Sequence, residues 1–220
     1  MIIAIDGPAA SGKSTTAIGV AKRLGIIYLD TGAMYRAVTF GLIEHNIKFE
    51  NSTIIENFLE KIDIKFSESS SGILLKLNGR DITKEIRSEI VTKNASEVSA
   101  LKSVRKSMVL IQRKMAESDD CVLEGRDIGT VVFPNANFKF FLIADETIRA
   151  ERRLEDLKAI GESSSIDDVM INLKKRDHKD STRMHSPLKK PDDAIIIDTS
   201  ILGINEVIDK IVNTVKHKGH

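Results

Sequence analysis

The chain has 220 residues, a formal net charge of +1 and 41% hydrophobic residues. This size and composition are typical of one globular domain with room for an inserted subdomain. A near-neutral charge gives no global attraction for nucleic acid or anionic membranes. The single cysteine, Cys121, excludes an intramolecular disulfide and fits a reducing compartment. No apolar stretch approaches the ~20 residues that span a bilayer. We therefore expect a cytoplasmic protein without nucleic-acid or membrane partners.

The N-terminal stretch predicts a buried strand followed by a phosphate-binding loop. Residues 2–5 are apolar. After Asp6, residues 7–14 match the eight-residue pattern G-x-x-x-x-G-K-[ST], and the predicted loop includes Thr15, which follows: Gly7, Pro8, Ala9, Ala10, Ser11, Gly12, Lys13, Ser14 and Thr15. In such a loop the backbone N–H groups and the positive end of the following helix face an anion. The pattern assigns Lys13 to the β- and γ-phosphates and the Ser14 hydroxyl to Mg²⁺.

The residues after this loop have the spacing that the motif requires. Ala17, Val20, Ala21 and Leu24 recur on one face of a predicted helix that opens at Ser14, and Gly25 is its predicted stop. A glycine-rich turn could match the pattern by chance, but it would not be expected to lie between a strand and a helix in this order. We therefore interpret residues 7–15 as a nucleotide-phosphate site.

A second α/β segment follows. Residues 26–29 predict a strand, and a helix begins at Asp30 and Thr31 with Arg36 in its second turn. Taken alone, this is also compatible with a capped helix that carries a solvated arginine. Residues 52–61 have helical spacing of apolar side chains.

The pattern then changes to short strands. Residues 62–66 alternate apolar and polar side chains, 67–72 form a polar loop, and 73–77 predict a second strand. Asn78-Gly79 is a strong hairpin signal, so residues 80–83 are the predicted return strand. We expect an inserted antiparallel unit over about 62–90. A long helix over about 88–116, containing Ser96 and Arg105, should follow it.

Another apolar strand, 121–123, leads into Glu124-Gly125-Arg126-Asp127-Ile128-Gly129-Thr130. The carboxyl edge of an open α/β sheet is where ligands bind, which makes Arg126 and Asp127 candidate site residues. A tight turn with a surface ion pair is the structural alternative.

The last third of the chain alternates strands and helices. Strands are predicted at 138–143 and 194–198, and helices from Asp145, after Ser165 and over 204–215, with 216–220 frayed. The helix from Asp145 carries Arg149, Arg152 and Arg153, and the segment 174–183 is rich in charge. Such a segment is either a solvated face or an arginine-bearing lid. The histidines have no metal-ligand spacing, so we expect no protein-bound zinc.

A phosphate-binding loop leaves open a kinase, a GTPase, an ATP-driven motor or a nucleotide-binding protein. The chain has no Asn-Lys-x-Asp segment that reads guanine. Its small size and the charge-rich segment 149–183 favour a phosphotransferase with a lid, because such enzymes work by positioning, electrostatic stabilisation and exclusion of water.

Four segments together resemble the bacterial cytidylate kinases, which phosphorylate CMP and dCMP. They are residues 7–15, Asp30-Thr31-Gly32-Ala33-Met34-Tyr35-Arg36, residues 125–134, and Arg176-Asp177 through Arg183. The second and third separate this family from adenylate and guanylate kinases. The resemblance covers nearly the whole chain, and the small β unit matches the enlarged acceptor-binding insert of the bacterial enzymes.

The resemblance implies an α/β fold, a five-stranded parallel sheet flanked by helices, with a small antiparallel insert and a helical lid. The implied ATP-binding core is 1–30, 117–148 and 191–220, the implied monophosphate-binding domain is 31–116, and the implied lid is 149–190. ATP and Mg²⁺ would bind at residues 7–15. The implied CMP ligands are Thr31, Arg36, Ser96, Arg105, Arg126, Asp127, Arg176, Asp180 and Arg183. The implied catalytic groups are Lys13, Arg126, Arg176 and Arg183.

Three positions depart from versions of the family pattern. Glu124 occupies a position where many members have Asp, and Thr31 a position where some have Ser; both residues keep the functional group. Lys179 occupies a position where some members have Arg in the lid. Whether Lys179 or Arg152 contacts phosphate stays open, as does the preference between CMP and dCMP. We expect a monomer. The alternatives are a kinase for shikimate or dephospho-coenzyme A, and an RNA-associated protein that hydrolyses ATP slowly.

Overall fold

The structure, a computed structural model, describes residues 1–69, 72–159 and 161–218. Its internal contacts divide the chain into two compact units. The first unit is Met1–Tyr28 with Ala116–His220, and the second is Leu29–Met115. In the part of the chain that the structure describes, no helix is long and apolar enough to cross a membrane.

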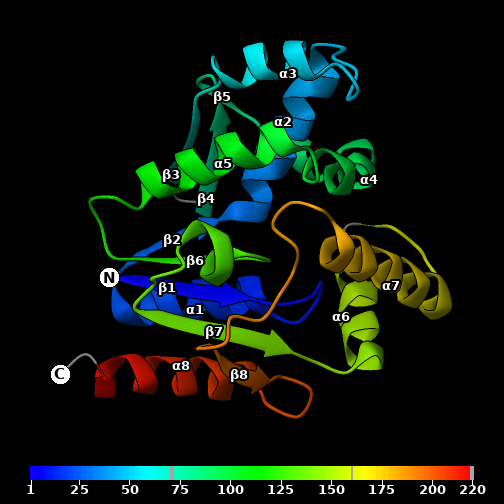
Figure 1. Ribbon diagram of the computed structural model, residues 1–220. Coiled ribbons are helices and arrows are strands. Elements are labelled where there is room, and N and C mark those ends of the chain that lie inside the picture. The colour runs from blue at the N-terminus through cyan, green and yellow to red at the C-terminus, as the bar shows by residue number, and fades with distance from the viewer. Residues whose placement is uncertain (70–71, 160, 219–220) are drawn as a thin grey trace. The chain divides into compact units, whose positions relative to one another are not determined.

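A five-stranded parallel sheet is the centre of the first unit, which confirms the predicted α/β class (Figure 1). The strand order is β2-β6-β1-β7-β8. These strands span Ile27–Asp30 (β2), Cys121–Gly125 (β6), Ile2–Asp6 (β1), Phe138–Ile143 (β7) and Ile195–Asp198 (β8). In the register of β1 and β6, Asp6 lies opposite Gly125. The phosphate-binding loop and the Arg126-Asp127 segment therefore leave the sheet side by side.

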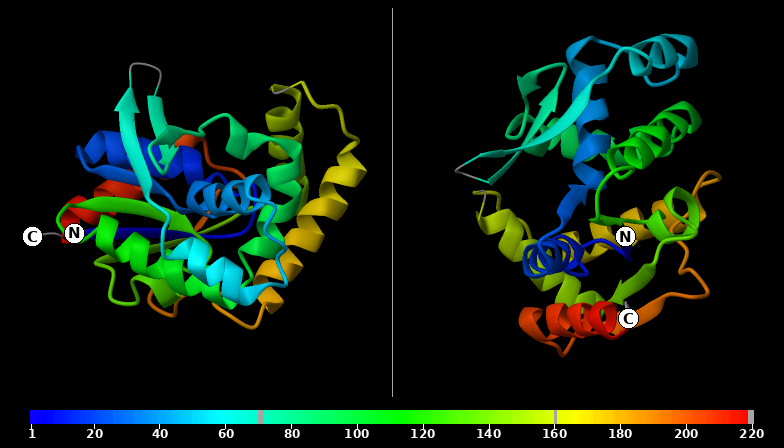
Figure 2. Two further views of the ribbon diagram at one scale, coloured as in Figure 1. Left: turned by 90° about the horizontal axis from the view of Figure 1, so that it is seen from above. Right: turned by 90° about the vertical axis from the view of Figure 1, so that its left-hand side faces the viewer.

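Two helices pack together against this sheet. The helices are α1 (Lys13–Leu24) and α8 (Ile204–Lys218), and they lie side by side in Figure 2. Their buried side chains share one core with the strands: Ala17, Val20, Ala21, Val207, Ile208, Ile211, Val212 and Val215 from the helices, and Ile3, Ile5, Phe140 and Leu142 from the strands. The helices approach so closely that a Cβ at Gly19 would lie 2.2 Å from Ile208 Cδ1.

The first unit also contains α6 (Glu146–Ala159), α7 (Ile166–Thr182) and one π-helical turn, η2 (Ile128–Val132). The predicted cap of α7 is confirmed, because the Ser165 hydroxyl accepts the N–H of Asp168 at 3.1 Å. Gly25 is the C-cap of α1, as predicted. The turn η2 stands where the sequence predicted only a glycine-bracketed turn.

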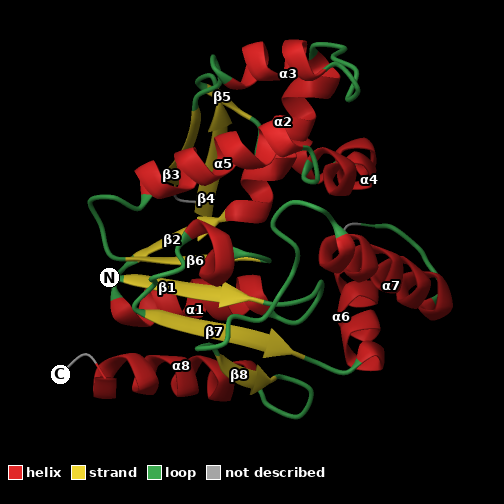
Figure 3. Ribbon diagram, in the orientation of Figure 1, coloured by secondary structure: helices red, strands yellow, loops and turns green. Residues whose placement is uncertain are grey.

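The second unit is built around α2 (Thr31–Glu44), as Figure 3 shows. Its buried side chains form a core of their own. Its other elements are α3 (Ser52–Leu59), β3 (Ile64–Ser69), β4 (Gly72–Leu77), β5 (Arg80–Asp81), η1 (Glu85–Arg87), α4 (Glu89–Val98) and α5 (Lys102–Met115). The three strands form the predicted antiparallel sheet, in the order β3-β4-β5. The core includes Met34, Val38, Leu42, Ile55, Leu75, Ile82, Val98 and Met108.

The predicted long helix over 88–116 is wrong in one respect, because α4 ends at Val98 and α5 begins at Lys102. At this break, side chains donate hydrogen bonds to backbone carbonyl groups. The Ser99 hydroxyl donates to the Ser96 carbonyl at 3.0 Å, and Arg105 Nη1 donates to the Ser99 carbonyl at 3.2 Å. The apolar spacing continues through both helices, so periodicity alone could not reveal the break.

Other element ends also differ from the prediction. Helix α1 begins at Lys13, one residue before Ser14, and the return strand β5 stops at Asp81. The predicted loop 67–72 is shorter, because β3 reaches Ser69 and β4 starts at Gly72; residues 70 and 71 lie outside the described part. The predicted frayed end is helical to Lys218, and residues 219 and 220 are not described. The separate lid over 149–190 stays a prediction.

Two isoleucines on α8 test the packing of this helix. Ile211 is fully buried, whereas Ile204 is 42% exposed. Ile211→Ala should lower the free energy of unfolding by about 2–5 kcal/mol, because it removes buried methyl groups and leaves a cavity. Ile204→Ala should change it by less than about 0.5 kcal/mol. Urea denaturation of the two variants measures both, and similar losses would contradict this packing.

Candidate active site

The phosphate-binding loop leaves β1 with little room around it. A Cβ at Gly7 would lie 2.3 Å from the Leu142 carbonyl oxygen of β7, so only glycine lets the loop start here. Further along, Ala10 has φ 57° and Gly12, the N-cap of α1, has φ 84°. The loop therefore turns through left-handed backbone at two places before the helix begins, which is the geometry of an anion-binding concavity.

Lys13 is the buried cation of this loop. Its side chain folds back over the loop, where Nζ donates to the Pro8 carbonyl at 2.5 Å and to Ser11 Oγ at 3.3 Å. Burial, followed by the nearby charge of Arg126, lowers the pKa of Lys13 to about 7. Arg176 acts in the same direction, while Glu124 and Asp6 oppose it. These groups therefore lie close enough to Lys13 to form one charged cluster.

Asp6, which precedes Gly7, is a carboxylate buried at the end of β1. Its two oxygens accept the N–H groups of Ile128 at 2.9 Å and Gly129 at 2.7 Å. Burial raises the pKa of Asp6 to about 6, although both hydrogen bonds lower it. Asp6 was not among the predicted site residues. Its signal was a carboxylate that ends an apolar strand directly before the glycine loop.

Four charged side chains near η2 form an alternating network. Arg126 Nε donates to Asp180 Oδ2 at 2.9 Å, and Arg183 approaches the other oxygen of Asp180 at 3.8 Å. Arg183 Nη2 also lies 3.4 Å from Asp127 Oδ1. All but Arg126, which is partly buried, have at most 8% of the side chain exposed, so the ion pairs are shielded from water. The structure thus brings the predicted residues Arg126 and Asp127 together with Asp180 and Arg183 at the C-terminal end of α7.

The predicted metal ligand Ser14 lies in the first turn of α1, next to Lys13, and is exposed. Within residues 1–69, 72–159 and 161–218, no group of three His, Cys, Asp or Glu side chains could hold a metal ion. An exposed hydroxyl beside a phosphate-binding loop fits a Mg²⁺ that keeps waters and substrate phosphates as its main ligands.

The other predicted acceptor residues belong to the second unit. Thr31 is buried at the start of α2, and Arg36 Nη2 lies 3.5 Å from Asp30 Oδ2. The guanidinium of Arg105 stacks over the Tyr35 ring at 5.3 Å. Ser96 Oγ is buried and has no hydrogen-bond partner among the described residues. A buried hydroxyl of this kind is suited to a polar ligand.

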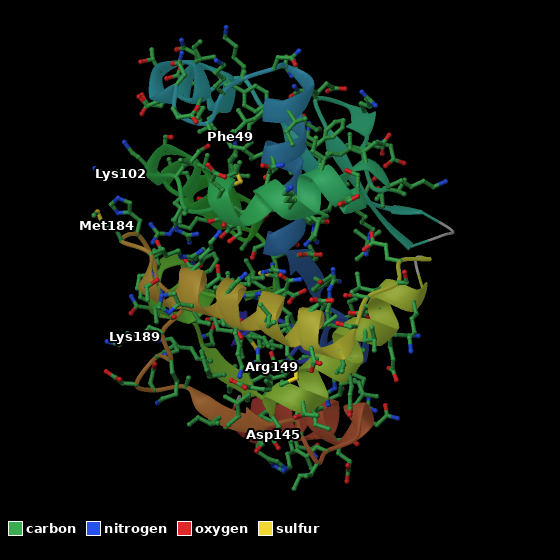
Figure 4. The ribbon with its side chains drawn as sticks, turned by 90° about the vertical axis from the view of Figure 1, so that its right-hand side faces the viewer. Phe49, Lys102, Asp145, Arg149, Met184 and Lys189 are labelled. Atoms are coloured by element: carbon green, nitrogen blue, oxygen red, sulfur yellow. The ribbon has the colours of Figure 1, made fainter. Side chains whose placement is uncertain are left out.

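Arg149 of α6 and Asp177 of α7, for which no role was predicted, lie beside the loop. Figure 4 labels Arg149 among the side chains of these two helices. Arg149 Nη1 donates to the Ala9 carbonyl at 3.1 Å, and Asp177 accepts the Ala9 N–H at 3.0 Å. Arg152 donates to the Thr199 carbonyl at 2.7 Å. Its Nη1 would be 3.8 Å from a Cβ at Gly12, so Arg152 lies beside the loop, whereas Lys179 is exposed on α7.

Comparison with known proteins agrees with this geometry. The cytidylate kinase family model matches residues 3–217. The chain is 46% identical to a cytidylate kinase of Halalkalibacterium halodurans, covering 99% of this chain and 98% of the relative. It is 47% identical to a cytidylate kinase of Carboxydothermus hydrogenoformans over the same shares.

Solved structures share the fold at low identity. An uncharacterized protein from Eubacterium ventriosum has a TM-score of 0.55 and 14% identity, and covers 98% of both chains. A shikimate kinase from Bacteroides thetaiotaomicron has a TM-score of 0.50 and 10% identity over 98% of both chains.

The buried carboxylate predicts a pH effect on stability. Because burial raises the pKa of Asp6 from 3.8 to about 6, its contribution to stability is full below about pH 4. It is lost as the pH rises through about 6. Between about pH 5 and pH 7 the wild-type protein should lose about 1 kcal/mol more stability than Asp6→Asn, which cannot titrate. Urea denaturation at the two pH values measures this, and equal pH slopes would refute it.

Proposed function

Because the chain belongs to the cytidylate kinase family, we propose that it transfers the γ-phosphoryl group of ATP to the α-phosphate of CMP or dCMP. The observation that carries this proposal is the cluster around Lys13. A glycine loop, a buried lysine and the arginines near it meet at the carboxyl edge of one sheet. Such a site stabilises charge on a transferred phosphoryl group by positioning and electrostatics.

The donor is ATP, held by residues 7–15. Backbone N–H groups of the loop and the first turn of α1 would face its phosphates. Lys13, which donates to the Pro8 carbonyl in this structure, would turn to the β- and γ-phosphates. Mg²⁺ would be held by the phosphates and the Ser14 hydroxyl, and would neutralise phosphate charge.

The acceptor is a cytosine monophosphate. Arg36, Arg126 and Arg176 would bind its phosphate, since a planar guanidinium can engage two phosphate oxygens at once. Asp180, in turn, holds Arg126 in one orientation through its carboxylate. No separate general base is required, because an ionised acceptor phosphate is already a nucleophile. Arg183 and Lys13 would offset the charge that develops on the transferred group.

Cytosine would be read by Ser96, Arg105 and Asp127, with Thr31 near the acceptor phosphate. A carboxylate such as Asp127 accepts a hydrogen bond from the exocyclic amine of cytosine, which uracil lacks. Uracil would offer this carboxylate no N–H donor at that position, and such a mismatch discriminates strongly between ligands. Asp127 is 4% exposed, so water would not readily replace the missing donor.

Neither alternative receives comparable support. The likeness to a shikimate kinase is a likeness of fold at 10% identity, and carries no substrate with it. An RNA-associated ATPase predicts ATP turnover that does not depend on CMP and a strongly salt-dependent affinity for RNA. The expectations of a cytoplasmic monomer that binds neither nucleic acid nor membrane stay predictions.

The deciding assay measures ADP release with CMP, dCMP, UMP and AMP supplied in parallel. CMP or dCMP should support turnover well above the other two acceptors. Asp127→Ala should narrow the preference for CMP over UMP by about tenfold or more, because the buried acceptor is gone. ADP release that is the same with every acceptor would refute the kinase, and an equal loss of CMP and ATP affinity in Asp127→Ala would refute base reading.

The lowered pKa of Lys13 leads us to expect proton uptake when a nucleotide binds. Its pKa is lowered to about 7 in the nucleotide-free protein, and a phosphate beside it should raise that pKa. At about pH 8, binding of MgADP should therefore take up about 0.9 proton. Calorimetry in two buffers with different ionisation enthalpies measures this number. Lys13→Arg, which stays charged, should take up none, and a wild-type value near zero would contradict the prediction.

A further inference from the structure

Two residues hold the tip of the phosphate-binding loop from outside. The Ala9 N–H donates to Asp177 Oδ1 at 3.0 Å, and the Ala9 carbonyl accepts from Arg149 Nη1 at 3.1 Å. Arg149 and Asp177 also form an ion pair with each other. The two backbone bonds fix the orientation of two successive peptide planes, Pro8–Ala9 and Ala9–Ala10. We name this set of contacts the Ala9 clamp.

The Ala9 clamp acts on the strained part of the loop. Ala10, the next residue, has φ 57°, a left-handed conformation that an alanine adopts only when its surroundings enforce it. The clamp orients the peptide immediately before Ala10. It therefore supplies a local restraint on the turn that gives the loop its anion-binding shape.

The clamp is also independent of the catalytic lysine. In this structure Lys13 Nζ and Ser11 Oγ both donate to the Pro8 carbonyl, at 2.5 and 3.1 Å. A phosphate that draws Lys13 away removes one of these restraints from the same peptide. The bonds from Asp177 and Arg149 involve neither Lys13 nor Ser11. They can therefore keep the loop in shape while Lys13 changes partner.

Burial makes the clamp strong. The side chains of Arg149 and Asp177 are 8% and 19% exposed. Around them, Ala9 packs in an apolar cluster with Ala150 of α6 and with Val169 and Leu173 of α7. Hydrogen bonds to charged groups strengthen when water is excluded. Because the arginine neutralises the carboxylate, the clamp also adds no net charge beside the loop.

We propose that Arg149 and Asp177 are positioning residues that hold the phosphate-binding loop in its nucleotide-binding shape through the two polar groups of Ala9. The proposal rests on the proposed function only in taking ATP and ADP as the ligands of this loop. It adds two residues to those proposed to bind the nucleotide, because neither side chain has to touch the nucleotide to act on the loop. Helices α6 and α7 thereby act on the donor site through the backbone of the loop.

The chain offers a matched control on the same two helices. Lys174 Nζ of α7 lies 2.8 Å from Glu146 Oε2 of α6. This pair is more than half exposed and is made by side chains alone. Exposed ion pairs of this kind contribute little to stability. Glu146→Gln therefore removes an ion pair between α6 and α7 and leaves the Ala9 clamp intact.

The test compares Asp177→Ala, Asp177→Asn and Glu146→Gln in the full-length protein. Asp177→Ala should raise the Kd for MgADP by about tenfold or more, because it removes a hydrogen bond between the backbone and a charged group. Asp177→Asn, whose amide oxygen can still accept the Ala9 N–H, should lose less. Glu146→Gln should stay within about twofold of wild type. The KM for CMP at saturating ATP should be unchanged in all three variants.

Amide hydrogen exchange of Ala9 gives a readout that does not depend on activity. The Ala9 amide should be protected in the nucleotide-free wild type and should exchange at least about tenfold faster in Asp177→Ala. Asp177→Asn keeps the test valid if the alanine variant does not fold. The proposal fails if a folded Asp177→Ala variant binds MgADP like wild type, if Glu146→Gln loses as much affinity as Asp177→Ala, or if Ala9 exchange in Asp177→Ala is unchanged. If Asp177→Ala does not fold, the proposal fails when Ala9 exchanges in Asp177→Asn as it does in wild type.

These outcomes separate the clamp from the proposed function. A wild-type protein that does not bind MgADP refutes the donor site itself, and Ala9 exchange then decides the clamp alone. A wild type that binds MgADP and phosphorylates CMP, with an Asp177→Ala variant that does so equally well, refutes only the clamp.

Discussion

The burial of opposite charges at the carboxyl end of the sheet is the constraint on which the first unit depends. Lys13 and Asp6 are 5% and 1% exposed. Isolated charges buried this deeply would be strongly unfavourable, so each needs partners. Asp6 finds them in two backbone N–H groups of η2, and Lys13 in the Pro8 carbonyl and Ser11. The two bonds of Asp6 also join the start of the phosphate-binding loop to the segment that follows Arg126 and Asp127.

This arrangement gathers positively charged side chains at a site where a negatively charged phosphate could bind. Burial, followed by the nearby charge of Arg126, lowers the pKa of Lys13 to about 7, so Lys13 does not carry a full positive charge near neutral pH. The arginines of the β6 edge and α7 are kept apart from one another by Asp180 and Asp127. A phosphoryl group would bring negative charge to these arginines and to Lys13. The positive groups would already be in place before it binds, which is what electrostatic preorganisation means.

Local patterns in the sequence predicted the strand, the loop, the helix caps and the small antiparallel sheet, because each depends on residues close together in the chain. Gly25, Ser165 and Asn78-Gly79 are of this kind. The same reasoning failed where one apolar period runs through a break, as between α4 and α5. It also failed at Asp6 and Arg149, which bond backbone groups 122 and 140 residues away, those of Ile128 and Ala9.

By itself, the sequence determined the position of the phosphate-binding loop and most of the alternation of strands and helices, since these follow from short motifs and from periodicity. The family and the fold class followed from the resemblance that four segments of the sequence carry. Only the tertiary structure decided that Asp6 ties this loop to η2 and that Arg149 and Asp177 grip Ala9. It also decided that Arg126, Asp127, Asp180 and Arg183 form one network. The physical reason is that such contacts join segments far apart in the chain, and no local pattern records which buried charge will meet which partner.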